Sequence, residues 1–189
     1  MTEAELYKFH EDVFKPIYGD LVAVLGSKPE QIAFEVEATL SHIAVAHTKP
    51  DIREDNLIKA HGHLKRAALD AVKILWLEYR EKTEKFIADD ELRRFAINSS
   101  EKELLEKYQA ATNKAREARR EELTNTGAAP EISIDLYYES AKAFCDVLDL
   151  IDPDKERQFQ KFRFWYKKKE IIVSFVVGFL SSLLVTYLF

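Results

Sequence analysis

The chain has 189 residues, enough for one domain with a hydrophobic core. Only 5 glycines and 5 prolines are present, which disfavours the turn-rich all-β folds that need more of both. The formal net charge of -5 argues against nucleic-acid binding as a main role. The single cysteine, Cys145, excludes an internal disulfide, and its apolar periodic surroundings predict a small core residue.

The first predicted helix begins at the chain's acidic start. Thr2 and Glu5 have the spacing of a capping box, in which each side chain bonds the other residue's backbone N–H. Pro16 predicts a kink or a break, and Gly26 predicts the end of the helix. The apolar residues at helical spacing are Leu6, Phe9, Val13 and Ile17.

Two further helices are predicted before position 97. Ser27 with Glu30 predicts the start of one helix, which Lys49–Pro50 ends, and its apolar stripe is Ile32, Val36, Leu40 and Ile43. Asp51 with Glu54 predicts the start of the next, a long helix that extends through Phe86, with Ile97 as an alternative end. Its apolar side is so wide that we expect it at the centre of a bundle. Members of that side are Leu57, Leu64, Ala68, Ala71, Leu75 and Tyr79.

A charged helix is predicted over residues 101–124, opened by Ser100 with Glu103. Its apolar stripe is thin and consists of Leu104, Tyr108, Ala111, Ala115 and Ala118. Because charged residues surround this stripe, the pattern indicates an exposed arm or a coiled-coil surface rather than a core helix. The helix is therefore a candidate surface for a protein partner.

The last two predicted helices follow a loop over residues 125–130. The first of them has a stripe of Ile134, Tyr137 or Tyr138, Ala141, Phe144 or Cys145, and Leu148. The sequence then predicts Asp152 as the N-cap of the next helix and Pro153 as its first residue. No helix-breaking residue lies between Pro153 and Phe189, so we expect one continuous helix to the end of the sequence.

Residues 171–189 form a run of 19 residues without a charge. As a helix the run would be about 28 Å long, close to the ~30 Å hydrocarbon core of a bilayer. The sequence therefore predicts an all-α fold: a soluble helical bundle over 1–152, a juxtamembrane helix over 153–170 and a C-terminal transmembrane helix over 171–189. Because the run ends the sequence, we expect a single-pass tail anchor with the N-terminal domain in the cytoplasm.

The residues before this run match a membrane interface. From Lys155 to Glu170 there are seven basic and two acidic residues. The whole chain carries -5 and the run none, which leaves -10 for residues 1–154. Aromatic rings favour the headgroup level and lysines the cytoplasmic, anionic leaflet. The predicted interface residues are Phe159, Phe162, Trp165, Tyr166, Lys167, Lys168 and Lys169.

Small residues recur every fourth position in the predicted span, at Ser174, Gly178 and Ser182. They share one helix face and would let two helix backbones approach closely, so they predict a packing face and a homo-oligomer. A chance occurrence is the competing interpretation, because small residues are common in membrane spans.

A polar stripe in the long helix is the only other candidate site: Lys59, His63, Arg66, Asp70 and Lys73. Spacings of three and four place these residues on one face. The stripe could bind an anion, a nucleotide or an acidic partner, or it could be a solvent face with Arg66 and Asp70 paired. Four of the five histidines lie between positions 42 and 63, but their spacing does not suit a metal. We predict no metal, no cofactor and no catalytic residue.

One segment carries a family resemblance. Residues 57–74, LIKAHGHLKRAALDAVKI, look like the long second helix of HEPN-like bundles. The overall plan is similar to small membrane effectors of prokaryotic antiviral systems, which oligomerise and perturb the membrane. HEPN ribonucleases use an arginine followed four to six residues later by a histidine, and this chain departs from that pattern. Its nearest pair, Arg53 and His61, has seven residues between, so ribonuclease activity is not carried over.

These observations predict a non-enzymatic membrane protein that self-associates and acts at the bilayer, in the manner of an antiviral-defence effector. One alternative is a monomeric membrane-tethered adaptor that recruits a cytosolic partner through the helix over 101–124. A divergent HEPN-like enzyme is the other.

Overall fold

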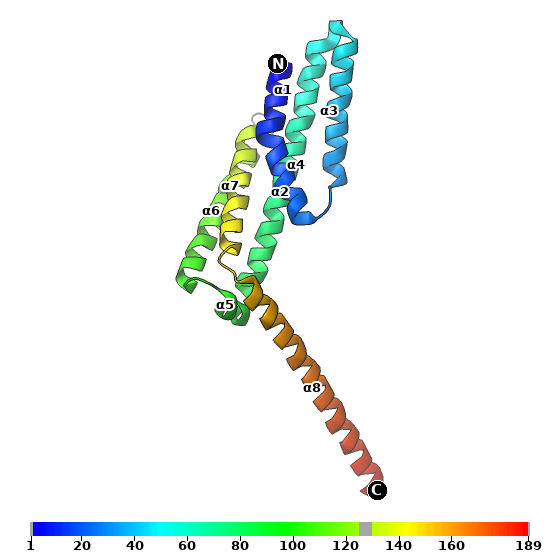
Figure 1. Ribbon diagram of the computed structural model, residues 1–189, viewed down its shortest axis with the longest axis vertical. Coiled ribbons are helices and arrows are strands. Elements are labelled where there is room, and N and C mark those ends of the chain that lie inside the picture. Colours follow the sequence, from blue (N-terminus) through cyan, green and yellow to red (C-terminus); the bar gives the residue numbers. More distant parts are fainter. Residues whose placement is uncertain (1, 125–129, 189) are drawn as a thin grey trace.

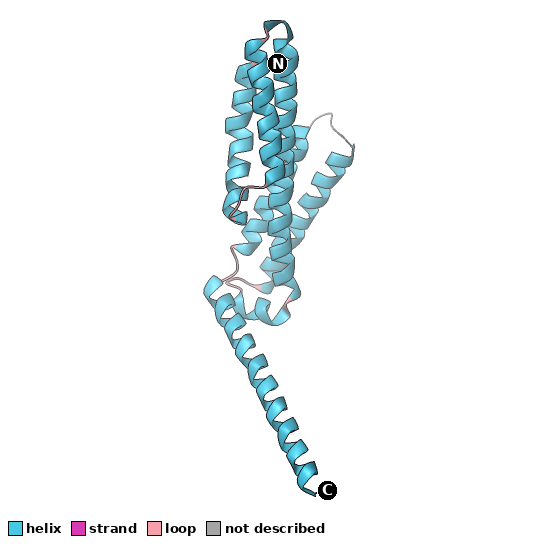
Figure 2. Cartoon of the chain, turned by 90° about the vertical axis from the view of Figure 1, so that its right-hand side faces the viewer, coloured by secondary structure: helices cyan, strands magenta, loops and turns pink. Residues whose placement is uncertain are grey.

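Helices make up nearly all of the chain in the computed structural model, which describes residues 2–124 and 130–188 (Figures 1 and 2). The side chains of 183–186 and 188 lie outside this description. An all-α bundle is therefore confirmed. Its helices are α1 (Glu3–Phe9), α2 (Lys15–Leu25), α3 (Glu30–Thr48), α4 (Arg53–Ala88), α5 (Asp90–Ala96), α6 (Glu101–Thr124), α7 (Pro130–Leu148) and α8 (Pro153–Leu188).

The N-terminal segment is continuous but irregular. The predicted capping box is present: the Glu5 backbone N–H donates to the Thr2 hydroxyl over 3.3 Å, and the Thr2 N–H donates to the Glu5 carboxylate over 2.7 Å. A π-helical turn, His10–Phe14, separates α1 from α2. Pro16 follows in the first turn of α2, and the wider turn before it accommodates the missing N–H. Gly26 ends α2 at φ 68°, in the left-handed region, as predicted.

The 36-residue helix α4 is the central element, as predicted. It packs against α3, α2 and α7, and α7 packs in turn against α6. The main core therefore follows α4 along its length. Its largest fully buried side chains include Ile17, Leu21, Ile32, Leu64, Leu75, Ile134, Tyr137 and Phe144.

Three details differ from the predictions for α3 and α4. Pro29 precedes α3 and Ile52 precedes α4, and neither helix has a side-chain N-cap, so Ser27 and Asp51 do not open them. Leu40, predicted to be inside, is 61% exposed, whereas Thr39 is buried. The buried positions of α3 are Ile32, Thr39 and Ala46, one every seven residues. This narrow seam arises because α3 packs mainly on one helix, α4.

The prediction for α6 was wrong in one respect. The helix is a core element rather than an exposed arm, since Ala111, Ala115 and Ala118 are buried against α7. Alanine presents little side chain, so a thin alanine stripe permits a close helix contact. The predicted N-cap is correct: the Glu103 N–H donates to the Ser100 hydroxyl over 3.1 Å. Residues 125–129 of the predicted loop lie outside the described residues.

Candidate functional site

Helix α8 leaves the bundle at the end opposite to the α3–α4 turn and extends away from it as a single helix (Figures 1 and 2). Its start is as predicted. The Asp152 carboxylate accepts from the backbone N–H groups of Asp154 and Lys155, each over 3.0 Å. Pro153 occupies the first helical position, where its missing N–H costs no hydrogen bond.

The backbone also fastens α8 to the bundle. Residues Ile97 and Ile151 form an isolated antiparallel bridge between the segments that follow α5 and precede α8. The Asn98 N–H donates to the Leu150 carbonyl over 2.8 Å, and the Asp152 N–H donates to the Ala96 carbonyl over 2.7 Å. Because these backbone contacts involve the N-cap residue Asp152 and the two residues before it, the position where α8 begins is well defined.

Side chains reinforce the junction. The Arg163 guanidinium bonds both carboxylate oxygens of Asp89, over 2.5 and 2.8 Å, and also reaches Glu91 over 3.2 Å. The same Asp89 caps α5, since it accepts from the Leu92 N–H over 3.1 Å. The hydrogen bond from Arg163 lowers the pKa of Asp89 below its ordinary value. One carboxylate thus serves both α5 and α8.

Phe159 belongs to this junction rather than to the exposed surface of α8. Its ring centroid lies 5.5 Å from that of Phe95, and the Arg163 guanidinium lies 4.9 Å from the Phe159 ring centroid. The ring also packs beside a second small core at the base of the bundle. That core consists of Phe86, Leu92, Ala96, Leu104 and Val147.

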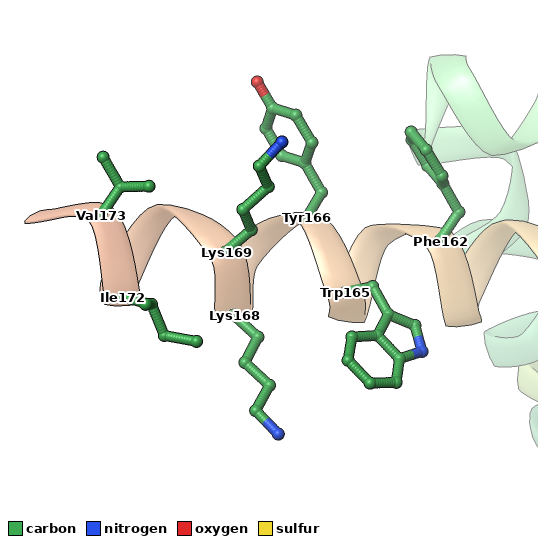
Figure 3. Close-up of a pocket in the computed structure, with 7 residues that line it drawn as sticks. All are labelled: Phe162, Trp165, Tyr166, Lys168, Lys169, Ile172 and Val173. Atoms are coloured by element: carbon green, nitrogen blue, oxygen red, sulfur yellow. The ribbon is translucent and has the colours of Figure 1, made fainter.

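The other predicted interface residues point away from the helix in several directions. In Figure 3, Phe162, Tyr166 and Lys169 project to one side of α8, and Trp165 and Lys168 project to the other. The Lys168 ammonium lies 5.4 Å from the Trp165 ring centroid, a cation–π contact. All residues of the open hollow here come from α8, so no second element walls it. The rings and cations form a belt around one helix.

Beyond this belt, the described part of α8 is mostly apolar, and the bundle does not cover it. Every described side chain in residues 164–182 is exposed. The apolar ones are between 46 and 74% exposed: Ile171, Ile172, Val173, Phe175, Val176, Val177, Phe179 and Leu180. A Cβ added at Gly178 would meet nothing within 4 Å, so the space beside this residue is open.

Within the part of the chain that the structure describes, no helix has the length and hydropathy of a membrane span. The predicted span over 171–189 includes residue 189 and the side chains of 183–186 and 188, which lie outside the described residues.

The residues of the predicted polar stripe of α4 have partners in α3, in α6 and in α4 itself. His63 and Arg66 contact the Glu35 carboxylate of α3 over 2.8 and 3.3 Å. Asp70 accepts from Gln31 over 2.9 Å, and burial raises the pKa of Asp70. Arg66 and Asp70 therefore bond residues of α3 in place of the pair considered from the sequence. Lys59 contacts Asp55 in its own helix over 2.6 Å, and Lys73 contacts Glu122 of α6 over 2.7 Å.

A polar groove between α1, α4 and α7 was missed from the sequence. Phe9 and Asp12 line it from the N-terminal segment, His61 and Lys65 from α4, and Glu131 from α7. His61 is only 8% exposed, and burial, followed by the nearby Lys65 charge, lowers its pKa. No group of three metal-ligating side chains is found in the described residues. The groove could not have been predicted, because its walls come from three distant segments.

Comparison with known proteins finds no family model, no curated protein and no solved structure that matches this chain. The resemblance to HEPN-like bundles stays a prediction.

Proposed function

We propose that α8 anchors the helical bundle to a lipid bilayer, with residues 171–189 in the hydrocarbon core and the bundle on the cytoplasmic side. One observation carries the proposal: the described apolar side chains in the uncharged part of α8 are exposed, and this part lies clear of the bundle. Each fully buried side chain of this kind is worth about 1.5–3 kcal/mol relative to water. A helix with apolar residues on every face needs an apolar surrounding.

The belt before this segment supports an interfacial position. Trp165 and Tyr166 are amphipathic rings of the kind that favour the headgroup level. Lys167, Lys168 and Lys169 are exposed and adjoin the uncharged run. Each basic residue near an anionic leaflet contributes about 1 kcal/mol of attraction. The charge asymmetry favours the orientation with this belt and the bundle in the cytoplasm.

The junction between α8 and the bundle would fix the position of the bundle relative to the bilayer. Arg163 lies eight residues before Ile171, about 12 Å along a helix. With its ion pair to Asp89 and the backbone contacts around Asp152, the bundle would be held at a set height above the bilayer.

The proposed action is that of a self-associating membrane protein. Ser174, Gly178 and Ser182 share one face, and the open space beside Gly178 leaves room for a second helix. An effector role in antiviral defence is supported by the resemblance of the overall plan alone.

The two tryptophans provide a test of anchoring. Trp76 is 4% exposed in the bundle core, whereas Trp165 is 65% exposed on α8. In a Trp76→Phe variant reconstituted from detergent into phosphatidylcholine–phosphatidylglycerol vesicles, we expect Trp165 fluorescence to shift to shorter wavelength. Lipids brominated in their acyl chains should quench it, because the ring would lie near the interface.

The matched control is Trp165→Phe. The fluorescence of its remaining tryptophan, Trp76, should not change when the protein is reconstituted into vesicles. Deletion of residues 171–189 should also abolish flotation of the protein with lipid. If Trp165 shows neither a shift nor quenching and the full chain does not float, the anchoring proposal is wrong.

A further inference from the structure

The buried histidine of α4, His61, packs as an apolar ring beneath the start of the chain. The N-terminal segment, residues 3–14, comprises α1 and the π-helical turn that follows it. The His61 ring meets the Phe9 ring of this segment edge-on, with the ring centroids 5.2 Å apart and the planes at 85°. Among the described residues, no group forms a hydrogen bond with the imidazole. The neutral ring therefore belongs to the packing between α1 and α4.

A proton on His61 would place a positive charge where no counter-ion contacts it. Among the described residues, no carboxylate forms an ion pair with this ring. Glu131 of α7 is paired with Lys65 of α4, and Glu5 is engaged in the capping box of α1. Asp12, which lines the same groove, is exposed to solvent. Because burial of an unpaired charge is costly, the packed ring is held neutral.

The surroundings of the groove act on the proton affinity of His61. Burial lowers its pKa most, and the positive charges of Lys65 and of the amino terminus lower it further, whereas Glu131 and Glu5 raise it. Lys8 adds another positive charge at the groove. Since the folded value lies below the unfolded value of about 6.5, the contribution of the packed ring is complete above that pH. It is lost as the pH falls from there toward the lower folded value.

The N-terminal segment is the part of the bundle that can respond to this charge. Helix α2 packs on α4 more extensively than α1 or the π-helical turn does. The turn, His10–Phe14, interrupts the regular α-helical hydrogen bonding between α1 and α2. The segment can therefore separate from α4 while α2 keeps Ile17 and Leu21 in the core.

We propose that protonation of His61 releases the N-terminal segment from α4 and α7, so that the docking of this segment is sensitive to mild acid. The charged ring can be hydrated only when Phe9 moves away from it. Release takes Leu6, Phe9 and Phe14 out of the core and uncovers the apolar side of α4 beneath them. The surface uncovered in this way lies at the end of the molecule away from α8 (Figure 1). The inference does not depend on anchoring by α8.

Two other histidines near this segment respond to acid in the opposite sense. The Nε2 atom of His47 lies 3.0 Å from the Glu3 carboxylate, and the Nδ1 atom of His10 lies 3.1 Å from that of Glu11. Protonation of either ring strengthens its ion pair. Both rings are about half exposed, so these pairs contribute little to stability. Neither histidine can therefore be the source of an acid-induced release.

Hydrogen exchange of the full chain in detergent tests the release. For the amides of residues 6–14, we expect protection, corrected for the intrinsic exchange rate, to fall several-fold between about pH 7.5 and about pH 5.5. The fall should be at most about tenfold, because an exposed histidine titrates near pH 6.5. His61→Gln and His61→Phe carry no titratable ring and should show no such fall. Constant protection in wild type, or the same fall in either variant, would overturn the proposal.

Matched controls locate the effect. His10→Gln, in the same segment, and His47→Gln, in α3, should both retain the fall, and its loss in either would assign the response to another histidine and contradict the proposal. Amides of α3 and α7 in the same samples should keep their protection. An equal loss there would show that the whole bundle unfolds, which also contradicts release of one segment. Flotation with lipid reports on anchoring separately: a chain that does not float would refute the anchoring and leave the release intact.

Discussion

Asp89 shows how one side chain can serve two elements at once. Its carboxylate caps α5 through the Leu92 N–H and also binds both terminal nitrogens of Arg163 in α8. The cap is a local interaction between residues three apart, whereas the ion pair joins residues 74 apart in the sequence. Two substitutions can separate these roles, because asparagine is also a good N-cap but carries no charge.

We expect Asp89→Ala to destabilise α5 by about 1 kcal/mol through loss of the cap, and also to release α8. Asp89→Asn should retain the cap and lose only the ion pair. Hydrogen exchange of the amides in Asp90–Ala96 checks this: exchange should accelerate strongly for alanine and much less for asparagine. Equal acceleration in the two variants would show that the cap contributes nothing.

The same carboxylate predicts a pH dependence. The pKa of Asp89 is lowered in the folded state by Arg163. Its stabilising contribution is therefore complete above the unfolded value of about 3.9 and is lost as the pH falls through the lower folded value. We expect the protection of the junction amides, corrected for the intrinsic exchange rate at each pH, to fall in wild type below about pH 4. Asp89→Asn should lack this component, and an identical acid response in both proteins would exclude Asp89 as its source.

At the residue scale, a side chain's hydrogen-bond partner can be predicted from the sequence only when the two residues lie close together along the chain. The N-caps at Thr2, Ser100 and Asp152 were predicted correctly, because each bonds backbone groups within three residues. The partners of His63 and Arg163 were not, because they come from other helices. Residue types and spacing place a side chain on a helix face, but they do not identify what that face meets.

Among the elements, the prediction for α6 was wrong. Its charge pattern favoured an exposed arm, yet the alanine stripe is buried against α7. The prediction depended on the charged residues around a thin apolar stripe, whereas small alanine side chains allow close packing of that stripe. The long α4 and the continuous α8 were easier to predict, since each depends on a local property: a wide apolar side in one and the absence of breakers in the other.

Adjacent alanines of α6 provide a matched test of close packing. Ala111 is buried and its carbonyl accepts from the Ser140 hydroxyl of α7, whereas Ala110 is exposed. Ala111→Leu should lower the free energy of unfolding by about 1–3 kcal/mol, because extra atoms force α6 and α7 apart. Ala110→Leu should leave it nearly unchanged. Urea unfolding followed by circular dichroism measures both, and equal stabilities would argue that α6 is loosely attached.

In the whole molecule, the apolar part of α8 lies at the far end of the structure, away from the bundle (Figure 1). If α8 acts as proposed, copies meet within one bilayer through α8.

The contact within one bilayer can be tested at Gly178. In lipid no hydrophobic drive brings helices together, so close backbone packing carries much of their association. Gly178→Leu should weaken association by about 1–2 kcal/mol, roughly a 5- to 30-fold change in the association constant. Because a side chain here meets nothing within the monomer, the fold of the single chain should be unaffected. Energy transfer between donor- and acceptor-labelled copies, diluted with lipid in one vesicle population, measures this association.

Val176→Leu is the control, since residue 176 lies on nearly the opposite side of the helix and is also exposed. Its energy transfer should match that of wild type. A Gly178→Leu variant that associates as tightly as the wild type would exclude the face formed by Ser174, Gly178 and Ser182.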